Sequence, residues 1–138
     1  MSEGLSVHAG GLPFAAVATA PRIPFPRNAL VSYHCWRNRD ISALADFTLV
    51  ADSGAYSADT HGAVITVADL CAWATEWRKH FAWVAALDVI GDPVASHLNW
   101  ELMRSHGVNA MPTVHFPALP QTIDTYAREG VTFMGLGG

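Results

Sequence analysis

The sequence predicts an α/β fold in which parallel strands alternate with helices. Apolar runs of strand length recur along the chain, and segments with helical periodicity separate them. Residues that typically begin or end a helix flank several of these segments. Together they predict about five parallel strands, arranged either as an open doubly wound sheet or as part of a (β/α)8 barrel of the TIM type.

The first half of the chain contains an irregular arm and two strands. Residues 1–28 are rich in Gly and Pro and show no sustained period, so we expect an irregular N-terminal arm. The run "ALVSYHCW" (29–36) predicts the first strand, "ISALADF" (41–47) a short helix, and "TLVA" (48–51) the second strand. A loop is expected from there to Gly62.

The next helix has a clear start signal. Thr66 and Asp69 have the spacing of a capping box. Apolar residues then recur at helical spacing, which predicts a helix over 66–80; they are Val67, Leu70, Cys71, Ala74 and Trp77. The run "FAWVAAL" (81–87) predicts the third strand.

Two further helix and strand pairs complete the pattern. Asp92 and Pro93 suit the N-cap and first position of a helix that ends near Gly107. "NAMPTV" (109–114) predicts the fourth strand. Pro120 can open a last helix that Gly130 closes, and "VTFMGL" (131–136) predicts the fifth strand.

The length and composition suit one globular domain. The chain has 138 residues, of which 51% are apolar. A complete (β/α)8 barrel takes roughly 200 to 250 residues. We therefore expect residues 29–138 to form a partial barrel domain, truncated at its C-terminus, which another chain could complete.

Charge and cysteine content exclude some classes of function. The net charge of −4 gives no overall basic field. A segment without Asp or Glu nevertheless holds Arg22, Arg27, Arg37 and Arg39, either a solvated loop or a local phosphate contact. The two cysteines, Cys35 and Cys71, indicate neither a disulfide framework nor a zinc site. The cysteine pattern therefore favours a reducing cytoplasm, and because no apolar run is long enough to span a membrane a soluble protein is expected.

Polar residues or glycines follow four of the predicted strands. Asp52 follows the second strand, Asp88 the third and His115 the fourth, and Gly137 and Gly138 follow the fifth. In parallel α/β folds the carboxyl ends of the strands meet at one edge, where ligands bind. Each residue has an ordinary structural explanation by itself, but their common register predicts a binding site.

Other polar residues near strand ends are given no role in chemistry. His34 and Cys35 are expected to belong to the core, and Asp92 to cap a helix. Asp59 and His61 lie in a loop that is either a lid or plain surface.

Three of these motifs resemble the tRNA-guanine transglycosylase superfamily, and more closely its phage and bacterial DNA-modifying branch, the DeoxyPurine in DNA protein A type. "DSGAYS" (52–57) is similar to the family's DSGGFQ-like motif, "LDVIGD" (87–92) to its second acidic strand end, and "LGG" (136–138) to its glycine motif. The resemblance runs from about Leu49 to Gly138. It implies a (β/α)8 barrel that exchanges guanine for a 7-deazaguanine base by breaking and remaking the N-glycosidic bond.

The resemblance also implies roles for single residues. Asp52 would be the catalytic acid that handles protons beside the reacting sugar and base. Ser53 and Gly54 would shape its turn and are counted among the base-binding residues. Asp88 would read the ring N–H and amino edge of the purine, for which a carboxylate is a good bidentate acceptor.

The other base contacts follow from the same comparison. His115 stands where tRNA-type relatives often have a glutamine and is expected to contact the base. Gly137 and Gly138 would let the backbone approach the flat base. The family's nucleophile is a further aspartate on a later strand, expected beyond Gly138, and the zinc site of the tRNA enzymes has no counterpart here. No cofactor is expected; the partners would be DNA or tRNA and a 7-deazaguanine.

Two alternatives remain open at this point. One is a barrel hydrolase that binds a metal through Asp52, Asp88 and His115. The other is a truncated, non-catalytic protein that binds a purine or a partner chain.

Overall fold

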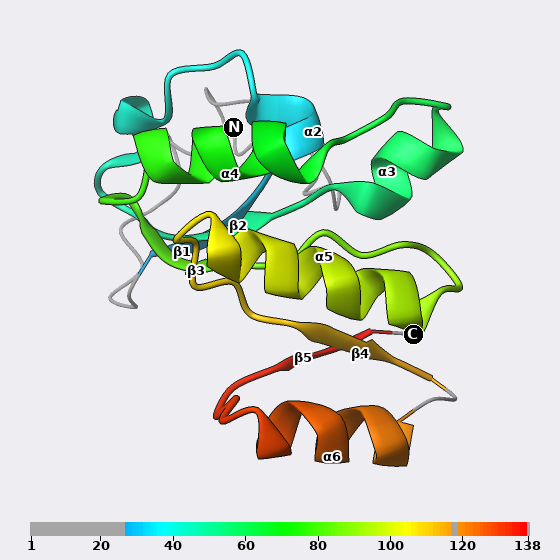
Figure 1. The fold of residues 1–138 in the computed structure, drawn as a ribbon. Helices are drawn as coiled ribbons and strands as arrows, with labels where there is room; N and C mark the ends of the chain where they lie inside the picture. The colour runs from blue at the N-terminus through cyan, green and yellow to red at the C-terminus, as the bar shows by residue number, and fades with distance from the viewer. Residues whose placement is uncertain (1–26, 117–118, 138) are drawn as a thin grey trace, which may run out of the picture.

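Strands and helices alternate along the chain, which confirms the predicted mixed α/β class (Figure 1). The computed structural model describes residues 27–116 and 119–137. The strands are β1 (Asn28–Ser32), β2 (Thr48–Asp52), β3 (Phe81–Val84), β4 (Thr113–His115) and β5 (Gly135–Gly137). The helices are α2 (Tyr33–Trp36), the 3₁₀ helix η1 (Ile41–Leu44), α3 (Ala55–Thr60), α4 (Val67–Glu76), α5 (Pro93–Ser105) and α6 (Leu119–Arg128). The arm expected over residues 1–28 lies, as far as residue 26, outside this range, as does Gly138.

The described strands form two small parallel sheets. One has the order β1-β2-β3 and the other the order β4-β5. A parallel bridge between Ala85 and Met111 links them just after β3. Met111 accepts from the amide of Ala86 at 2.8 Å and donates to the carbonyl of Val84 at 2.7 Å. Each strand therefore neighbours the strand that precedes or follows it in sequence.

This order bears on the two architectures that the sequence left open. A doubly wound sheet reverses its strand order at a switch point, and no such reversal occurs among the five described strands. The described strands also do not close into a barrel. What they establish is a parallel α/β arrangement in sequential order.

The two long central helices begin where their caps predict. The Thr66 hydroxyl accepts from the amide of Asp69 at 3.1 Å and donates to the Asp69 carboxylate at 2.7 Å. Asp92 accepts from the amide of Ala95 at 2.9 Å, and Pro93 occupies the first turn of α5. These bonds satisfy amides that a helix start leaves without a partner.

Other boundaries differ from the prediction. The first strand ends at Ser32 instead of continuing to Trp36, because its neighbour β2 ends at the paired residue Asp52 and offers no further backbone partner. Residues 33–36 turn into α2, and α3 occupies part of the segment expected to be a loop. Strand β4 begins only at Thr113, because Pro112 has no amide hydrogen to donate.

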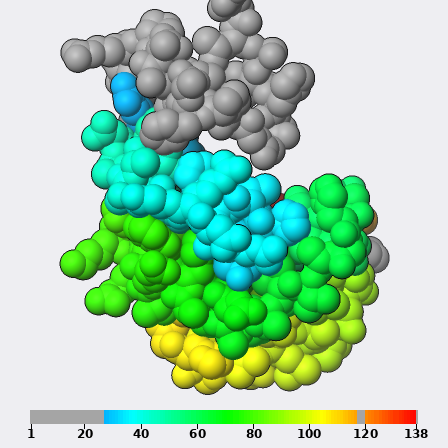
Figure 2. Space-filling model, turned by 90° about the horizontal axis from the view of Figure 1, so that it is seen from above, coloured from blue at the N-terminus to red at the C-terminus, as the bar shows by residue number. Residues whose placement is uncertain are grey.

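The core lies between the sheets and the helices. Alternate strand residues such as Val31, Leu49 and Ala51 are buried on the helix side. They pack with residues of α4, α5 and α6; the largest of these are Leu70, Trp73, Trp100, Met103 and Tyr126. Residues of α2, η1, α4 and α5 form the helical surface seen from above in Figure 2.

The opposite face of the sheets is not covered by a described helix. Leu30 and Trp83 both pair with Val50 and are 66% and 43% exposed. Phe133 stacks on Trp83 with 4.4 Å between ring centroids and is 48% exposed. An apolar strip therefore crosses the sheet on the side away from α4 and α5. No helix in the described residues is long and apolar enough to cross a membrane.

Candidate functional site

The residues predicted to form the site lie at the carboxyl ends of the strands. Asp52 is the last residue of β2, His115 the last of β4 and Gly137 the last of β5. Asp88 lies in the segment that follows β3. Asp52 pairs with Ser32 across the sheet, and His115 pairs with Gly137. The structure therefore places these four residues along one edge, while Gly138 lies outside the described residues.

Asp88 and His115 are in direct contact. The Nε2 atom of His115 lies 3.2 Å from Oδ2 of Asp88, although the residues are 27 positions apart in sequence. The side chain of Asp88 is 15% exposed and that of His115 is 42% exposed. The carboxylate is thus largely enclosed, and the imidazole stands between it and the solvent.

Asp52 closes the turn that follows β2. Its Oδ2 atom accepts a hydrogen bond from the amide of Gly54 at 2.9 Å. The hydroxyl of Ser53 accepts from the amide of Ala55 at 3.3 Å, and Ser53 is only 2% exposed. Ser53 therefore shapes the start of α3, and because its side chain is buried it is not open to a base in this structure.

Position 54 requires glycine for two reasons: its backbone conformation, and the lack of space for a Cβ atom. Its φ angle is +74°, in the left-handed region that L-residues with a side chain rarely adopt. A Cβ at this position would collide with the hydroxyl of Ser32 and would lie 2.7 Å from the Cβ of His34. The turn that holds Asp52 is thus pressed against the end of β1.

Gly137 fulfils a similar steric requirement on the other side of the site. A Cβ at Gly137 would lie 2.6 Å from both Cε1 and Nδ1 of His115. A side chain there would displace the imidazole ring. Gly137 therefore lets His115 lie flat against β5 while it reaches Asp88.

Both carboxyl groups favour the protonated form more than a free aspartate does. Burial raises the pKa of Asp52, and hydrogen bonds from the amides of Gly54 and Ser53 offset part of this increase. Burial also raises the pKa of Asp88, and the charge of Asp52 raises it further, while the side chains of His115 and Thr113 lower it. For both acids, burial is the largest cause of the raised pKa.

The sequence analysis gave no role in the site to two residues that lie near it. Ser32 received no role from the sequence, and His34 was expected in the core but is half-buried in α2. Within the described residues the Ser32 hydroxyl and Nδ1 of His34 are buried without a hydrogen-bond partner. The parallel pairing of Ser32 with Asp52 is the signal that could have identified Ser32.

The neighbouring predictions have mixed outcomes. Cys35 is exposed, so its expected place in the core is wrong. It lies in the helical turn α2, where its side chain faces away from the sheet, because the strand ends at Ser32. His61 stacks on His34 with 5.7 Å between ring centroids, and Asp59 is exposed on α3.

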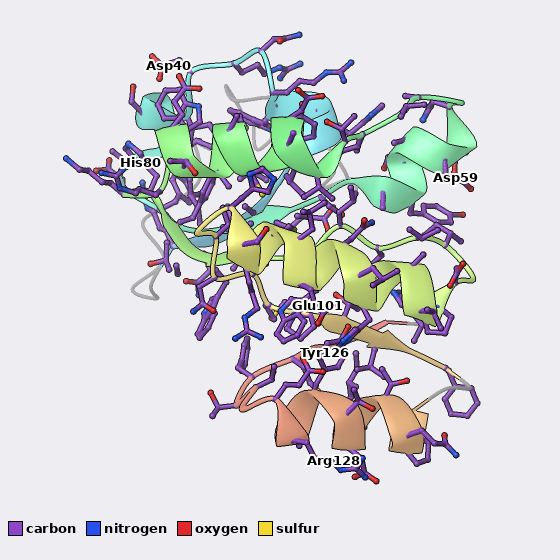
Figure 3. The ribbon with its side chains drawn as sticks, viewed as in Figure 1. Asp40, Asp59, His80, Glu101, Tyr126 and Arg128 are labelled. Carbon is purple, nitrogen blue, oxygen red and sulfur yellow. The ribbon has the colours of Figure 1, made fainter. Side chains whose placement is uncertain are left out.

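The arrangement of ligand atoms does not favour a metal at this edge. Among the described residues, only His97, Glu101 and Glu129 bring three possible ligand atoms within 4.8 Å of one another. His97 and Glu101 belong to α5 and Glu129 follows α6, and the ring of His97 packs on that of Tyr126; Figure 3 labels Glu101 and Tyr126. Asp52, Asp88 and His115 do not form such a group, so the metal-hydrolase alternative gains no support from their geometry.

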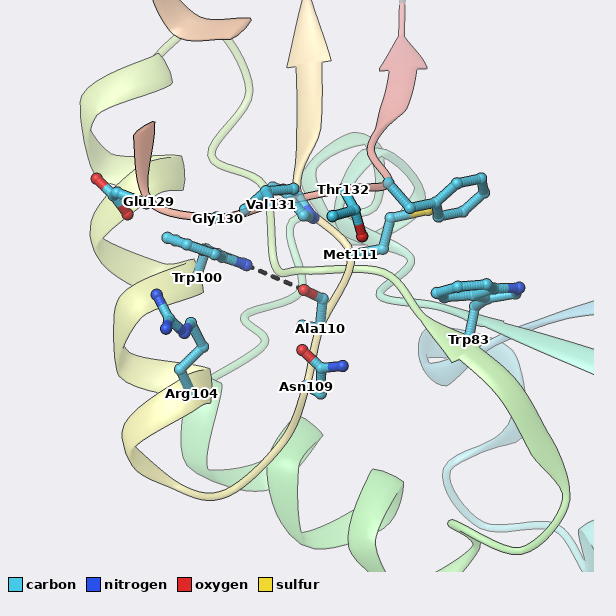
Figure 4. Close-up of a pocket in the computed structure, with 12 residues that line it drawn as sticks. Trp83, Trp100, Arg104, Asn109, Ala110, Met111, Glu129, Gly130, Val131 and Thr132 are labelled. Atoms are coloured by element: carbon cyan, nitrogen blue, oxygen red, sulfur yellow. Dashed lines mark hydrogen bonds between the residues drawn. The ribbon is translucent and has the colours of Figure 1, made fainter. Parts of the chain in front are cut away.

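One pocket of the described residues lies near the amino ends of β4 and β5. It has a volume of about 190 Å³ and is lined by the segments that precede β4 and β5 together with Trp83 and Trp100 (Figure 4). The indole of Trp100 donates to the carbonyl of Ala110 at 2.9 Å. In parallel α/β folds, active sites lie at the C-terminal ends of the strands. Asp52 and Asp88, whose pKa values are raised, lie at that end. This pocket is therefore not the candidate site.

The edge has the groups needed to recognise and protonate a planar heterocycle. An ionised carboxylate accepts two hydrogen bonds, and a protonated one donates a proton. Comparisons of the chain with models of protein families, with curated proteins and with solved structures gave no match.

Proposed function

We propose that the chain supplies the acid and the base-recognition residues of a transglycosylase that exchanges guanine for a 7-deazaguanine in DNA or tRNA. One observation carries the proposal. Asp52 and Asp88, the two acids that the family motifs single out, lie at one edge of the sheets, and each has a pKa raised by burial. Base exchange needs a carboxylate to read the purine and an acid to move a proton.

In this proposal Asp88 recognises the base. Its carboxylate is largely enclosed, so a hydrogen bond to it is weakly screened by water. The N1–H and 2-amino groups of a guanine-like edge present two donors to such a carboxylate. The space beside Gly137 that a Cβ would fill is occupied by the ring of His115, so the base would approach Asp88 from another side.

Asp52 serves the proton transfer. It is held by the amide of Gly54, and its raised pKa brings the carboxyl group closer to neutral pH, where it exchanges protons most effectively. The resemblance assigns the covalent nucleophile to a later strand than those described here. Asp52 is accordingly proposed as the acid and base and not as the nucleophile.

We further propose that the strands belong to a (β/α)8 barrel. Their sequential parallel order suits a barrel, and the apolar strip of Leu30, Trp83 and Phe133 would face its interior. Later strands, from this protein or from another chain, would cover that strip. The nucleic acid would then approach the edge that carries Asp52 and Asp88.

Base binding tests the proposal without requiring turnover. The chain is titrated by calorimetry with 7-deazaguanine, guanine, hypoxanthine and adenine. We expect the two guanine-like bases to bind, hypoxanthine to bind more weakly because it lacks the 2-amino donor, and adenine to bind weakest. Equal affinity for all four bases, or no binding of any, would contradict the proposal.

Exchange of radiolabelled guanine into DNA and tRNA then separates an enzyme from a binding protein. Exchange into one polymer identifies the substrate. Selective binding of guanine-like bases without exchange, in protein that carries the nucleophile-bearing strand, would support the non-catalytic purine-binding alternative.

A further inference from the structure

The imidazole of His115 lies between two fixed groups. One edge of the ring reaches Asp88, with Nε2 at 3.2 Å from Oδ2. The other edge, with Nδ1 and Cε1, faces Gly137 so closely that a Cβ there would lie 2.6 Å from both atoms. The ring has little freedom to move toward β5.

This contact occupies part of the Asp88 carboxylate. Nε2 of His115 is within hydrogen-bond distance of Oδ2 of Asp88, and the side chain of Thr113 also acts on this carboxylate. Nε2 must carry a hydrogen to bond to an ionised carboxylate, because two acceptors do not attract each other. A carboxylate has about four acceptor positions, so one bond from His115 does not use all of them.

We propose that His115 is a positioning residue for Asp88: its Nε2–H holds Oδ2, and the absence of a side chain at Gly137 leaves the space that the ring occupies, so that the carboxylate keeps one orientation toward the ligand. His115 then acts on a base through Asp88 and does not itself read the base. The identity of that base rests on the proposed function, whereas the positioning of Asp88 does not.

The groups around Asp88 determine how removal of the His115 ring should change the pKa of Asp88. His115 and Thr113 face it from β4, Asp52 from β2, and Tyr126 from α6. Burial raises the pKa of Tyr126 to about 12, so this group stays neutral. His115 and Thr113 are the two groups that favour the ionised form of Asp88, so loss of the ring should raise the Asp88 pKa further.

The test uses the chain without ligand and follows the Asp88 carboxyl carbon by NMR as the pH is varied. In His115→Phe the pKa of Asp88 should rise, and in His115→Gln, which keeps an N–H donor, it should return toward the parent value. His106→Phe changes an exposed histidine at the end of α5 and should leave Asp88 unaffected.

A second pair of variants tests the role of the backbone. Gly137→Ala should displace the ring and raise the Asp88 pKa in the same direction as His115→Phe. Gly135→Ala is the comparison variant, because a Cβ there would be in ordinary contact with Met111 and Thr113 at 3.4 Å, and His115 is not among its nearest neighbours. We expect a smaller change of the Asp88 pKa in Gly135→Ala than in Gly137→Ala.

The outcomes separate this inference from the proposed function. An Asp88 pKa that is the same in the parent, His115→Phe and Gly137→Ala would overturn the positioning role. If those shifts occur but 7-deazaguanine does not bind the parent chain, the positioning stands and the proposed base is wrong. If it binds, His115→Phe should weaken binding about tenfold, and His115→Gln should restore part of the affinity.

Discussion

Asp52 and Ser32 are paired residues at the ends of two neighbouring parallel strands, and the turn after Asp52 packs onto the end of the other strand. The contact point is Gly54, which donates its amide to the Asp52 carboxylate and leaves no room for a side chain against Ser32 and His34. The position of the proposed acid therefore depends on a steric fit between two segments that are distant in sequence.

Replacement of Gly54 tests this fit. Gly54→Ala forces alanine into the left-handed region, which costs roughly 1 to 2 kcal/mol, and adds an overlap that typically costs about 1 to 3 kcal/mol more. Gly62→Ala is the matched control, because Gly62 has a φ of +64° and open space around its Cβ position. Urea unfolding should show a larger loss of stability for Gly54→Ala, and equal losses in the two variants would argue against the contact.

Asp52→Asn should slow base exchange more than it weakens base binding. The substitution keeps the shape and the acceptor for the Gly54 amide but removes the transferable proton. General acid–base groups contribute about 10²- to 10⁴-fold to rates, and we expect a decrease of that size in kcat. The measurement is radiolabelled guanine exchange by protein that carries the nucleophile-bearing strand, in one chain or two. Parent-like kcat would rule out Asp52 as the acid.

The same substitution should change the pH dependence of stability. The pKa of Asp52 is raised in the folded state above its ordinary value of 3.8. Protonation of Asp52 therefore stabilises the folded state relative to the unfolded state. This contribution to the free energy of unfolding is fully present below pH 3.8 and is lost as the pH rises through the folded-state pKa of Asp52. Asp52→Asn should therefore be more stable than the parent at pH 7, and the gain should vanish near pH 4.

The comparison requires a control for net charge. Asp59→Asn removes one negative charge from an exposed position on α3, and it should give little of this gain. Urea unfolding at several pH values measures all three proteins. A gain for Asp52→Asn that is the same at pH 4 and pH 7 would refute the linkage.

The apolar strip on the uncovered sheet face should promote association. Leu30 and Trp83 are 66% and 43% exposed there, and exposed apolar patches on sheets mark interfaces or aggregation sites. Leu30→Thr and Trp83→Thr should lower the mass measured by light scattering at a given concentration. Val64→Thr, at a residue that is 82% exposed outside the sheets, should not. A monomeric parent chain would contradict this prediction.

Local patterns were sufficient to predict the alternation of strands and helices and the edge at which the polar residues meet. The caps at Thr66 and Asp92 act through bonds within three residues, so they can be read directly from sequence. Asp52, Asp88, His115 and Gly137 were found because each follows an apolar strand, and parallel strands end at one edge. Their chemical roles stay predictions.

Features that depend on long-range packing could not be predicted. Strand β1 ends at Ser32 because its partner ends, and Gly54 is required because of Ser32 and His34. Neither residue has a local pattern that reveals the contact. The division into two small sheets likewise depends on the geometry near the bridge between Ala85 and Met111, which no periodicity encodes.

The affinity of Asp88→Asn for 7-deazaguanine tests the proposed base recognition most directly. Asparagine places an amide donor against the N–H donors of the base, and the loss of one bidentate contact should cost about 1 to 3 kcal/mol, or about 5- to 150-fold in affinity. Asp92→Asn is the matched control, since asparagine also caps helices and Asp92 lies at the start of α5. Calorimetry should show the loss in Asp88→Asn and parent-like affinity in Asp92→Asn, whereas an unchanged affinity in Asp88→Asn would contradict the assignment of this edge as a purine site.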